Sequence, residues 1–148
     1  MFTDAELETE LTTDPIAVGY IGKDDATTTS LINAPNMSIA INRGRIDKTD
    51  FMAEILPIID EIRAMAVGAV QTKWQYRIST MIAPASYVDA SSQVTQSMLN
   101  ELVTDGLATA AQVTGLLNRL GSRAEQLWGS GTFVLWTDVA RVRNAKGR

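Results

Sequence analysis

Carboxylates are the side chains of this chain best suited to acid–base chemistry, because the sequence contains no histidine and no cysteine. Their absence excludes Ser-His and Cys-His nucleophile pairs and removes the usual ligands of transition metals. A catalytic carboxylate pair would have to converge on one cleft. Asp60 and Glu61 are neighbours on an expected helix and point about 100° apart, while Glu54 and Glu61 share a face opposite much of an isoleucine stripe. We interpret these acids as a solvated helix face and expect no catalytic residue.

Other motifs do not indicate a site for a metal or for phosphate. Asp24 and Asp25 form an isolated pair, without the alternating acids and closing glutamate of a calcium loop. Gly129 and Gly131 follow an expected helix, whereas a phosphate-binding loop places its glycines before one. The sequence therefore predicts no cofactor and no metal site, and we expect the protein not to be an enzyme.

The net charge and its distribution bear on possible partners. The 148 residues carry a net charge of −4, which argues against a freestanding nucleic-acid binder. The two ends of the chain have opposite sign, which indicates either two solvated termini or docking surfaces for other subunits. On the second interpretation, the basic end is the candidate partner-binding segment. The acids at the start are Asp4, Glu6, Glu8, Glu10 and Asp14, and the bases at the end are Arg141, Arg143, Lys146 and Arg148.

Helices must position these groups, and three capping boxes mark where helices begin. In each box a hydroxyl accepts the amide of the third helical residue, whose own side chain bonds back to the cap. The boxes are Thr3-x-x-Glu6, Thr109-x-x-Gln112 and Ser122-x-x-Glu125. Apolar residues at helical spacing predict further helices over residues 24–34, 47–66, 71–82, 89–105 and 137–143.

Breaks and strands complete the expected fold. Pro57 lies within the apolar stripe of residues 47–66, so we expect two helical segments that meet there at an angle. Alternation predicts a strand within residues 37–46, and TFVLW at 132–136 also has the character of a strand. The sequence thus predicts a mainly α fold, a single domain of about seven short helices with one or two small strands. We expect an N-terminal arm with short helices over 1–36, a helical core domain over 37–136 and a basic C-terminal tail over 137–148.

The stretch SRAEQLWGSGTF, residues 122–133, concentrates turn-forming residues around one aromatic side chain. Its serine and glutamate begin a helix that is too short to be stable alone. Its tryptophan would pin this helix to the core, and its two glycines would let the chain turn into the following run. We interpret the stretch as a structural joint, a turn that sets the direction in which the C-terminal residues continue. The joint consists of Ser122, Glu125, Trp128, Gly129 and Gly131.

A helix-turn-helix is an alternative interpretation of residues 109–128. Two expected helices flank Gly121, as the DNA-binding motif requires. The second helix offers one base, Arg123, with an acid beside it, so DNA reading is the weaker interpretation. The tryptophans could form a stacking platform, but aromatic residues at such spacing belong more often to a core. They are Trp74, Trp128 and Trp136.

Four stretches occur in a suggestive order along the chain. They are ELTTDPIAVGY at 10–20, Leu31-Ile32-Asn33, IDKTDF at 46–51, and SRAEQLWGSGT at 122–132 with Asp138-Val139 after it. Together they resemble a family of small proteins from tailed bacteriophages and prophages, which reads roughly as EL-x-x-DP-x-x-x-GY, LN, D-x-x-x-F and SRAE-x-L before a glycine. The chain departs from that family at Trp128, where a small residue is expected, and by the strand-like MSIAINRGRI at 37–46.

The resemblance implies a phage virion or morphogenesis protein, most consistently a head–tail connector subunit of the adaptor type. Such adaptors are small and mainly α, and they form a ring (about twelve subunits) beneath the portal. The implied partners are other copies of the chain, the portal protein, tail or neck proteins, and DNA that passes without sequence recognition, with no membrane. The implied location is the head–tail junction of the virion, and the host cytoplasm during assembly. The alternatives are a head-decoration or tail-completion protein and a small helix-turn-helix DNA-binding regulator.

The charge pattern agrees with such a ring. A net acidic subunit suits a DNA channel, because DNA must slide and not adhere. An acidic start and a basic tail could dock head-to-tail, the heterologous contact that closes into rings. The tail lacks an apolar anchor after Val142, so we expect it to become ordered only on a neighbouring subunit or the portal. Deletion of Arg141–Arg148 should then leave the rest of the chain folded.

Overall fold

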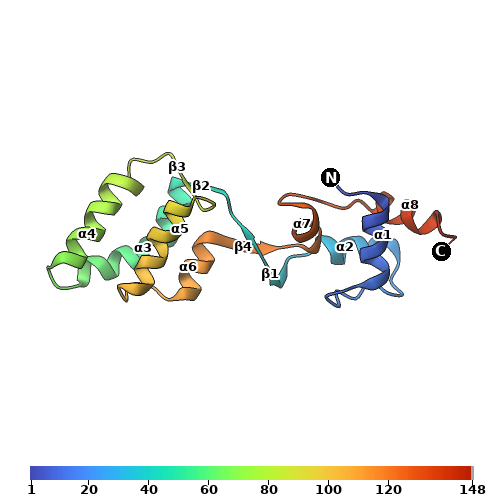
Figure 1. Cartoon of the computed structure of the whole chain (residues 1–148), viewed down its shortest axis with the longest axis horizontal. Coiled ribbons are helices and arrows are strands. Elements are labelled where there is room, and N and C mark those ends of the chain that lie inside the picture. The colour runs from blue at the N-terminus through green and yellow to red at the C-terminus, as the bar shows by residue number, and fades with distance from the viewer. Residues whose placement is uncertain (148) are drawn as a thin grey trace. The chain divides into compact units, whose positions relative to one another are not determined.

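The computed structural model describes residues 1–147 and is mainly helical, as predicted (Figure 1). The three predicted capping boxes are all formed, so the local signals for helix starts are confirmed. Over the described residues the elements are α1 (Asp4–Thr13), α2 (Asp25–Asn33), β1 (Asn36–Asn42), β2 (Arg45–Asp47), α3 (Lys48–Ala64), α4 (Ala69–Arg77), the π-helical η1 (Ile78–Ile82), β3 (Tyr87–Asp89), α5 (Gln93–Thr104), α6 (Ala110–Leu117), β4 (Asn118–Gly121), α7 (Arg123–Trp128) and α8 (Trp136–Asn144).

The chain forms two compact units with their own cores. Unit 1 contains residues 1–41 and the chain from residue 120 onward, and unit 2 contains residues 42–119. Apolar residues from both ends of the chain, which the sequence assigned to an arm over 1–36 and a tail over 137–148, share one core. Leu7, Ile32 and Val139 are fully buried in that core. The sequence signals were local, and they could not report that distant segments pack together.

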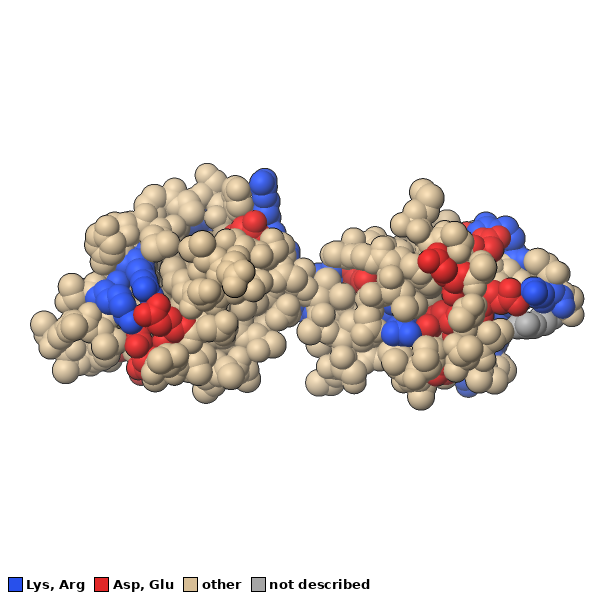
Figure 2. Space-filling view, viewed as in Figure 1, with Lys and Arg blue, Asp and Glu red and all other residues tan. Residues whose placement is uncertain are grey.

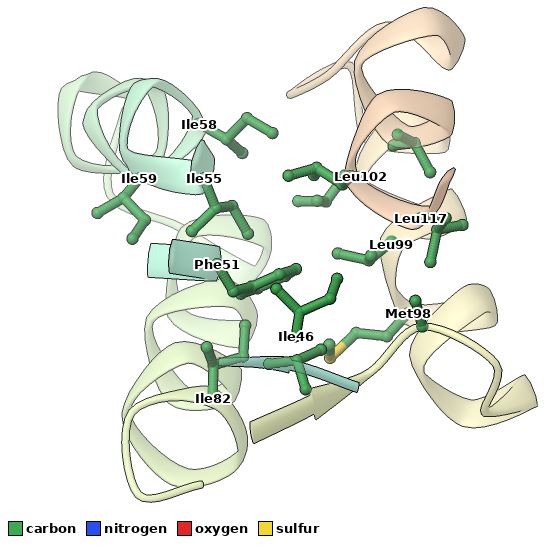
Figure 3. Close-up of a cluster of buried hydrophobic side chains, with 14 of the residues drawn as sticks. Ile46, Phe51, Ile55, Ile58, Ile59, Ile82, Met98, Leu99, Leu102 and Leu117 are labelled. Carbon is green, nitrogen blue, oxygen red and sulfur yellow. The ribbon is translucent and has the colours of Figure 1, made fainter. Parts of the chain in front are cut away.

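Unit 2 is held together by one stripe of α3 that faces α5 and α6 (Figure 3). The stripe is Phe51, Ile55, Ile58, Ile59 and Ile62, all at most 4% exposed. At about 25 cal/mol per Å² of buried apolar area, each such side chain stabilises the fold by about 1.5–3 kcal/mol. In Figure 3, Leu99 and Leu102 lie across from the isoleucines of α3. The predicted helical stripe of residues 47–66 is therefore the centre of the unit.

Pro57 does not divide α3, so the expectation of two segments is wrong. The helix runs continuously from Lys48 to Ala64 with Pro57 inside it. A proline here removes the hydrogen bond to the carbonyl of Ala53, but both residues lie on the exposed face, where water can bond to that carbonyl. A break would instead have turned part of the buried isoleucine stripe away from α5. Tertiary packing thus overrides the local penalty.

A two-stranded antiparallel sheet joins the entry of α3 to the residues before α5. Ile46 of β2 pairs with Val88 of β3, and both side chains are buried. Asp89 belongs to this sheet and does not begin a helix as predicted; its carboxylate accepts the Ser91 amide, and α5 starts after Ser92. The residue that the sequence assigned to the helix start is therefore the last residue of β3.

The strand predicted within residues 37–46 is present as β1, which pairs with β4, and as β2. Gly121 of β4 allows a close approach, because a Cβ atom there would lie 2.1 Å from Cγ1 of Ile41. The run at 132–136 is not a strand. Residues 132–135 belong to no helix or strand, and Trp136 begins α8. The α8 start is capped by Asp138, whose carboxylate accepts the Leu135 amide at 3.0 Å.

Candidate interaction site

Most of the stretches that carry the family resemblance meet in unit 1. Glu10 and Tyr20 of the first stretch, Asn33 of the second, and Arg123 of the last all belong to it. The stretch at 46–51 lies in unit 2, where it supplies core side chains. The pattern thus describes mainly one folded unit, and its polar residues contact one another there.

The DP-x-x-x-GY stretch forms a tight turn after α1. Asp14 adopts a left-handed conformation with φ 41° and ends the helix. Its carboxylate accepts the amides of Val18 and Gly19, both at 2.7 Å, and that of Tyr20 at 3.3 Å. Gly19, with φ 98°, tolerates the backbone conformation that this turn requires. The turn thereby delivers the Tyr20 side chain, which is fully buried, to the core of unit 1.

A buried ion pair joins α1 to α7. The Nε and Nη2 atoms of Arg123 donate to the two carboxylate oxygens of Glu10 at 2.7 and 2.9 Å, and Nη1 donates to Gln126. The side chains of Arg123 and Glu10 are only 10% and 5% exposed. The bonded carboxylate raises the pKa of Arg123 above its usual range. We call this contact the latch.

The Tyr20 hydroxyl lies in the same interior and has no hydrogen-bond partner among the described residues. Burial, and next the negative charge of Glu10, raise the pKa of Tyr20 well above its usual range. The phenol is therefore neutral at physiological pH. The ring of Tyr20 packs in the core of unit 1, with the phenol close to the Glu10 carboxylate of the latch.

The predicted joint forms a closed exit loop after α7. Glu125 bonds back to the Ser122 amide at 3.1 Å, and its second oxygen accepts the Gly131 amide at 2.8 Å. Gly129 and Gly131 have φ values of 102° and 82°, as the turn requires. Trp128 is half-buried and packs on Phe2, with ring centroids 4.8 Å apart. The glutamate thus fixes both ends of the joint.

Asn33 holds the segment that follows the joint. Its amide donates to the Val134 carbonyl at 2.7 Å, and its oxygen accepts the Val134 amide at 2.9 Å. This two-point contact replaces a neighbouring strand and buries Val134 completely. Phe133 and Leu135, on either side of the buried Val134, are exposed. The sequence does not predict the contact between Asn33 and Val134, because the two residues are 101 positions apart.

Three large apolar side chains of this segment are therefore exposed, and we call these three residues the strip. Phe133, Leu135 and Trp136 are 63%, 53% and 60% exposed. The sequence placed all three tryptophans in the core. That is correct for Trp74, which is buried and donates its indole N–H to Asp105, and wrong for Trp136. The core of unit 1 thus leaves these three side chains more than half exposed.

The basic end of the chain is paired with the acidic start. Arg141 bonds to Asp4 at 2.7 Å, and Lys146 lies 3.4 Å from Glu8. Arg143 bonds to Asp25 at 2.8 Å. Figure 2 shows the acidic and basic side chains of this unit lying side by side. These three basic residues therefore each pair with an acidic residue of the same unit.

These contacts correct the expected tail. The predicted partner-binding residues Arg141 and Arg143 lie in α8, which is anchored by Val139 and by Val142, 5% exposed. Arg148 lies outside the described residues. Order in this segment does not require a neighbour, and deletion of 141–148 would remove part of the unit 1 core.

A hollow of about 540 Å³ lies at the end of α8 away from the strip. Its apolar lining includes Leu11, Tyr20, Ile21 and Val142. The charged residues around it include acids and bases in equal number, Glu8 and Asp25 with Lys23 and Arg143. Of these apolar residues, Leu11, Tyr20 and Val142 are at most 6% exposed, and Ile21, at 70%, is the one open to solvent.

The helix-turn-helix alternative loses the features that suggested it. A strand, β4, separates α6 from α7, and the division between the units falls within that strand. Arg123, the base offered for DNA reading, is buried in the latch. Among residues 1–147 no group of three or more acidic side chains is placed to hold a metal ion, and no helix is long and apolar enough to cross a membrane.

Comparisons with protein-family models, with curated proteins and with solved structures found no match to this chain.

Proposed function

We propose that the chain is a structural subunit of a tailed-phage virion, an adaptor-type connector at the head–tail junction. It works through its shape and through contacts with neighbouring subunits around the DNA channel. The place in the virion rests on the resemblance of the motifs. The structural observation that carries the proposal is the strip, since it offers a surface for another protein.

The size of the strip supports a protein contact. Aromatic side chains bury roughly 150–250 Å² each, so three large side chains at 53–63% exposure offer about 350 Å² of apolar surface. The largest apolar patch on a monomeric protein is about 300–600 Å² and is often functional. The joint and Asn33 fix the backbone of the strip in advance, so little conformational entropy is lost when a partner binds.

The charges of unit 1 support a subunit that DNA passes without adhering. Arg123, Arg141, Arg143 and Lys146 are all paired with acids of the same unit. A paired base gives little counterion release when it meets phosphate, and the net charge of −4 adds repulsion. Neither feature suits a regulator that must hold DNA.

The test locates the protein in particles of the phage or prophage that encodes it. Immunogold labelling should mark one vertex, where the head meets the tail, and quantitative mass spectrometry should give about a dozen copies per particle. A chain with Phe133, Leu135 and Trp136 all changed to serine should remain folded and fail to enter particles. Val67→Ser, which changes a 91% exposed residue of unit 2, is the matched control.

The other outcomes favour the alternatives. Hundreds of copies over the head would indicate a decoration protein, and a position at the distal end of the tail would indicate tail completion. A purified protein that shifts DNA in a low-salt gel would indicate a regulator. Mature particles without the protein would overturn the proposal.

A further inference from the structure

We infer that unit 2 carries a contact between two copies of this chain, in which the same uncharged face of each copy meets the other. The face is formed by α4, η1, β3 and the first turns of α5. The inference goes beyond the proposed function and does not depend on it, because it rests on residues outside the strip. We call this surface the neutral face, and its large apolar side chains are Val70, Tyr76, Met81, Tyr87 and Val94.

Charged residues are scarce in the segment that builds the neutral face. The chain has 13 basic and 17 acidic residues, and three of them lie within residues 64–100, a quarter of its length. On the side of unit 2 that Figure 2 shows, most of the surface carries no charged side chain. A surface that stays in water is best served by about 25–35% charged residues, whereas the centre of an interface is depleted of them. The three charged residues all bond within unit 2: Lys73 and Arg77 to Glu101, and Asp89 to the Ser91 amide.

Large apolar side chains of this face lie open to water. Tyr76 is 66% exposed, Val94 65%, Met81 47% and Tyr87 43%. Met81 of η1 and Val94 of α5 line one groove of about 350 Å³, so these two elements present a common surface. Tyrosine and methionine are enriched in protein interfaces. Each of these side chains would leave water when the face is covered, which is the main source of affinity in an interface.

The π-helical turn η1 is a second observation that marks this face. The Ala83 amide donates to the Ile78 carbonyl, five residues back, at 2.8 Å. Such turns are rare, and they are found frequently at functional sites. This one carries Met81 and lies in the chain between Tyr76 and Tyr87.

The composition of the neutral face favours a second copy of the chain as its partner. A two-fold contact brings a surface against itself, so a charged group there meets its own like charge. Serine, threonine and glutamine side chains both donate and accept hydrogen bonds, so they can bond to their own kind. A charged partner such as DNA would gain no attraction from them. The exposed polar side chains of α4, η1 and the first turns of α5 are all of these three types: Thr72, Gln75, Ser79, Thr80, Gln93 and Ser97.

The area of the face agrees with that of a stable dimer. At about 200 Å² for a tyrosine and about 100 Å² for a valine or methionine, the five apolar side chains expose about 350 Å². A standard interface covers ~800 Å² on each partner, of which roughly 450 Å² is non-polar. Exposed Ala83 and Pro84 and the carbon atoms of the polar side chains are available for the rest. Arg45 lies over the Tyr87 ring at 4.3 Å and opposite Asp89 in the β2–β3 pair, which suits the polar rim of such an interface.

Sedimentation equilibrium of the full chain tests the contact. The expected result is a monomer–dimer equilibrium with a dissociation constant below about 100 μM, without species larger than the dimer. Tyr76→Lys and Val94→Lys should each raise this constant at least tenfold, because a two-fold contact places the new charge on both sides of the interface. Thr114→Lys adds the same charge at an exposed position of α6 and should leave the constant unchanged. Circular dichroism confirms that each variant is folded.

Hydrogen exchange at two protein concentrations locates the contact. Peptides from residues 69–97 should exchange more slowly at about 500 μM than at about 1 μM, where the dimer dissociates. Peptides of unit 1 should exchange equally at both concentrations. Serine at Phe133, Leu135 and Trp136 should likewise leave the dimer intact, because the strip takes no part in it.

Three outcomes would overturn the inference: a chain that stays monomeric up to about 1 mM, a dimer that survives both lysine variants on the face, or association that continues past the dimer. The last would mean that the face meets a different surface. None of them bears on the proposed function, which is tested by the position of the protein in particles. Conversely, a dimer formed as expected by a protein that is absent from particles would keep the contact and reject the function.

Discussion

The latch between Glu10 and Arg123 yields the sharpest prediction about stability. Arg123→Met removes the guanidinium but keeps most of the apolar stem of the side chain. It leaves the Glu10 carboxylate buried without its partner, at 5% exposure. We expect this variant to destabilise unit 1 strongly, and the reason is the stranded charge and not the lost attraction.

The magnitude follows from burial. Both side chains are at least nine-tenths buried, so solvent screens neither of them. Breaking a buried pair from one side costs about 3–5 kcal/mol, whereas replacing both partners by apolar residues is often neutral or stabilising. The double variant Glu10→Met, Arg123→Met should therefore be more stable than either single variant. Against a total stability of about 5–15 kcal/mol, the single change leaves unit 1 marginal.

Hydrogen exchange followed by mass spectrometry measures this effect in each unit separately. Peptides from residues 1–41 and from 120 onward should lose protection in Arg123→Met, while those from 42–119 should not. Arg63→Met is the control, since Arg63 pairs with Asp60 at the surface, with side chains 69% and 65% exposed. That change should cost no more than about 0.5 kcal/mol. A loss below about 1 kcal/mol in Arg123→Met, or a double variant worse than both singles, would refute the reasoning.

Three further changes test other parts of the structure. Asn33→Ala leaves the amide and carbonyl of a buried residue without partners, so unit 1 should lose about 1–3 kcal/mol, with faster exchange at 132–135; an equal loss of protection in unit 2 would contradict this. Pro57→Ala restores a hydrogen bond to α3. The ~3 kcal/mol penalty of proline within a helix, less about 0.4–1 kcal/mol that proline contributes by restricting the unfolded chain, predicts that the free energy of unfolding in denaturant rises by about 2 kcal/mol. No rise would mean that the helix is bent there. The bonded Lys73 ammonium, and next the Trp74 N–H, lower the pKa of Asp105. Asp105 therefore contributes to the stability of the fold at pH values above its unfolded pKa of about 3.9, and this contribution is lost as pH falls through its lower native pKa. Acid titration of Asp105→Asn should therefore show less loss of unit 2 stability below about pH 4 than the original chain.

Local signals were sufficient for the elements and their caps. Each capping box depends on residues three positions apart, and all three are formed. The apolar stripe of α3 likewise needs no information beyond its own spacing. These features could be predicted because the physics that creates them acts within one or two turns of helix.

The candidate site could not be predicted in this way. Glu10 and Arg123 are 113 positions apart, and Asn33 and Val134 are 101 apart. Neither pair has a local signal in the sequence, because its two members lie on segments that are far apart in the chain. The same limit explains the tail: the charges of Asp4 and Arg141 suggested contacts with other subunits, because the sequence does not show that the two helices meet.

Unit 1 is assembled from two segments, one before and one after unit 2 in the sequence, and this has a consequence during synthesis. Residues 42–119 leave the ribosome as one continuous stretch and can fold while translation proceeds. The first 41 residues must wait, because the arginine of the latch and both valines of α8 are made last. The nascent protein therefore lacks the latch and the strip until its final residues emerge, so the core of unit 1 closes only after the whole of unit 2 has been synthesised.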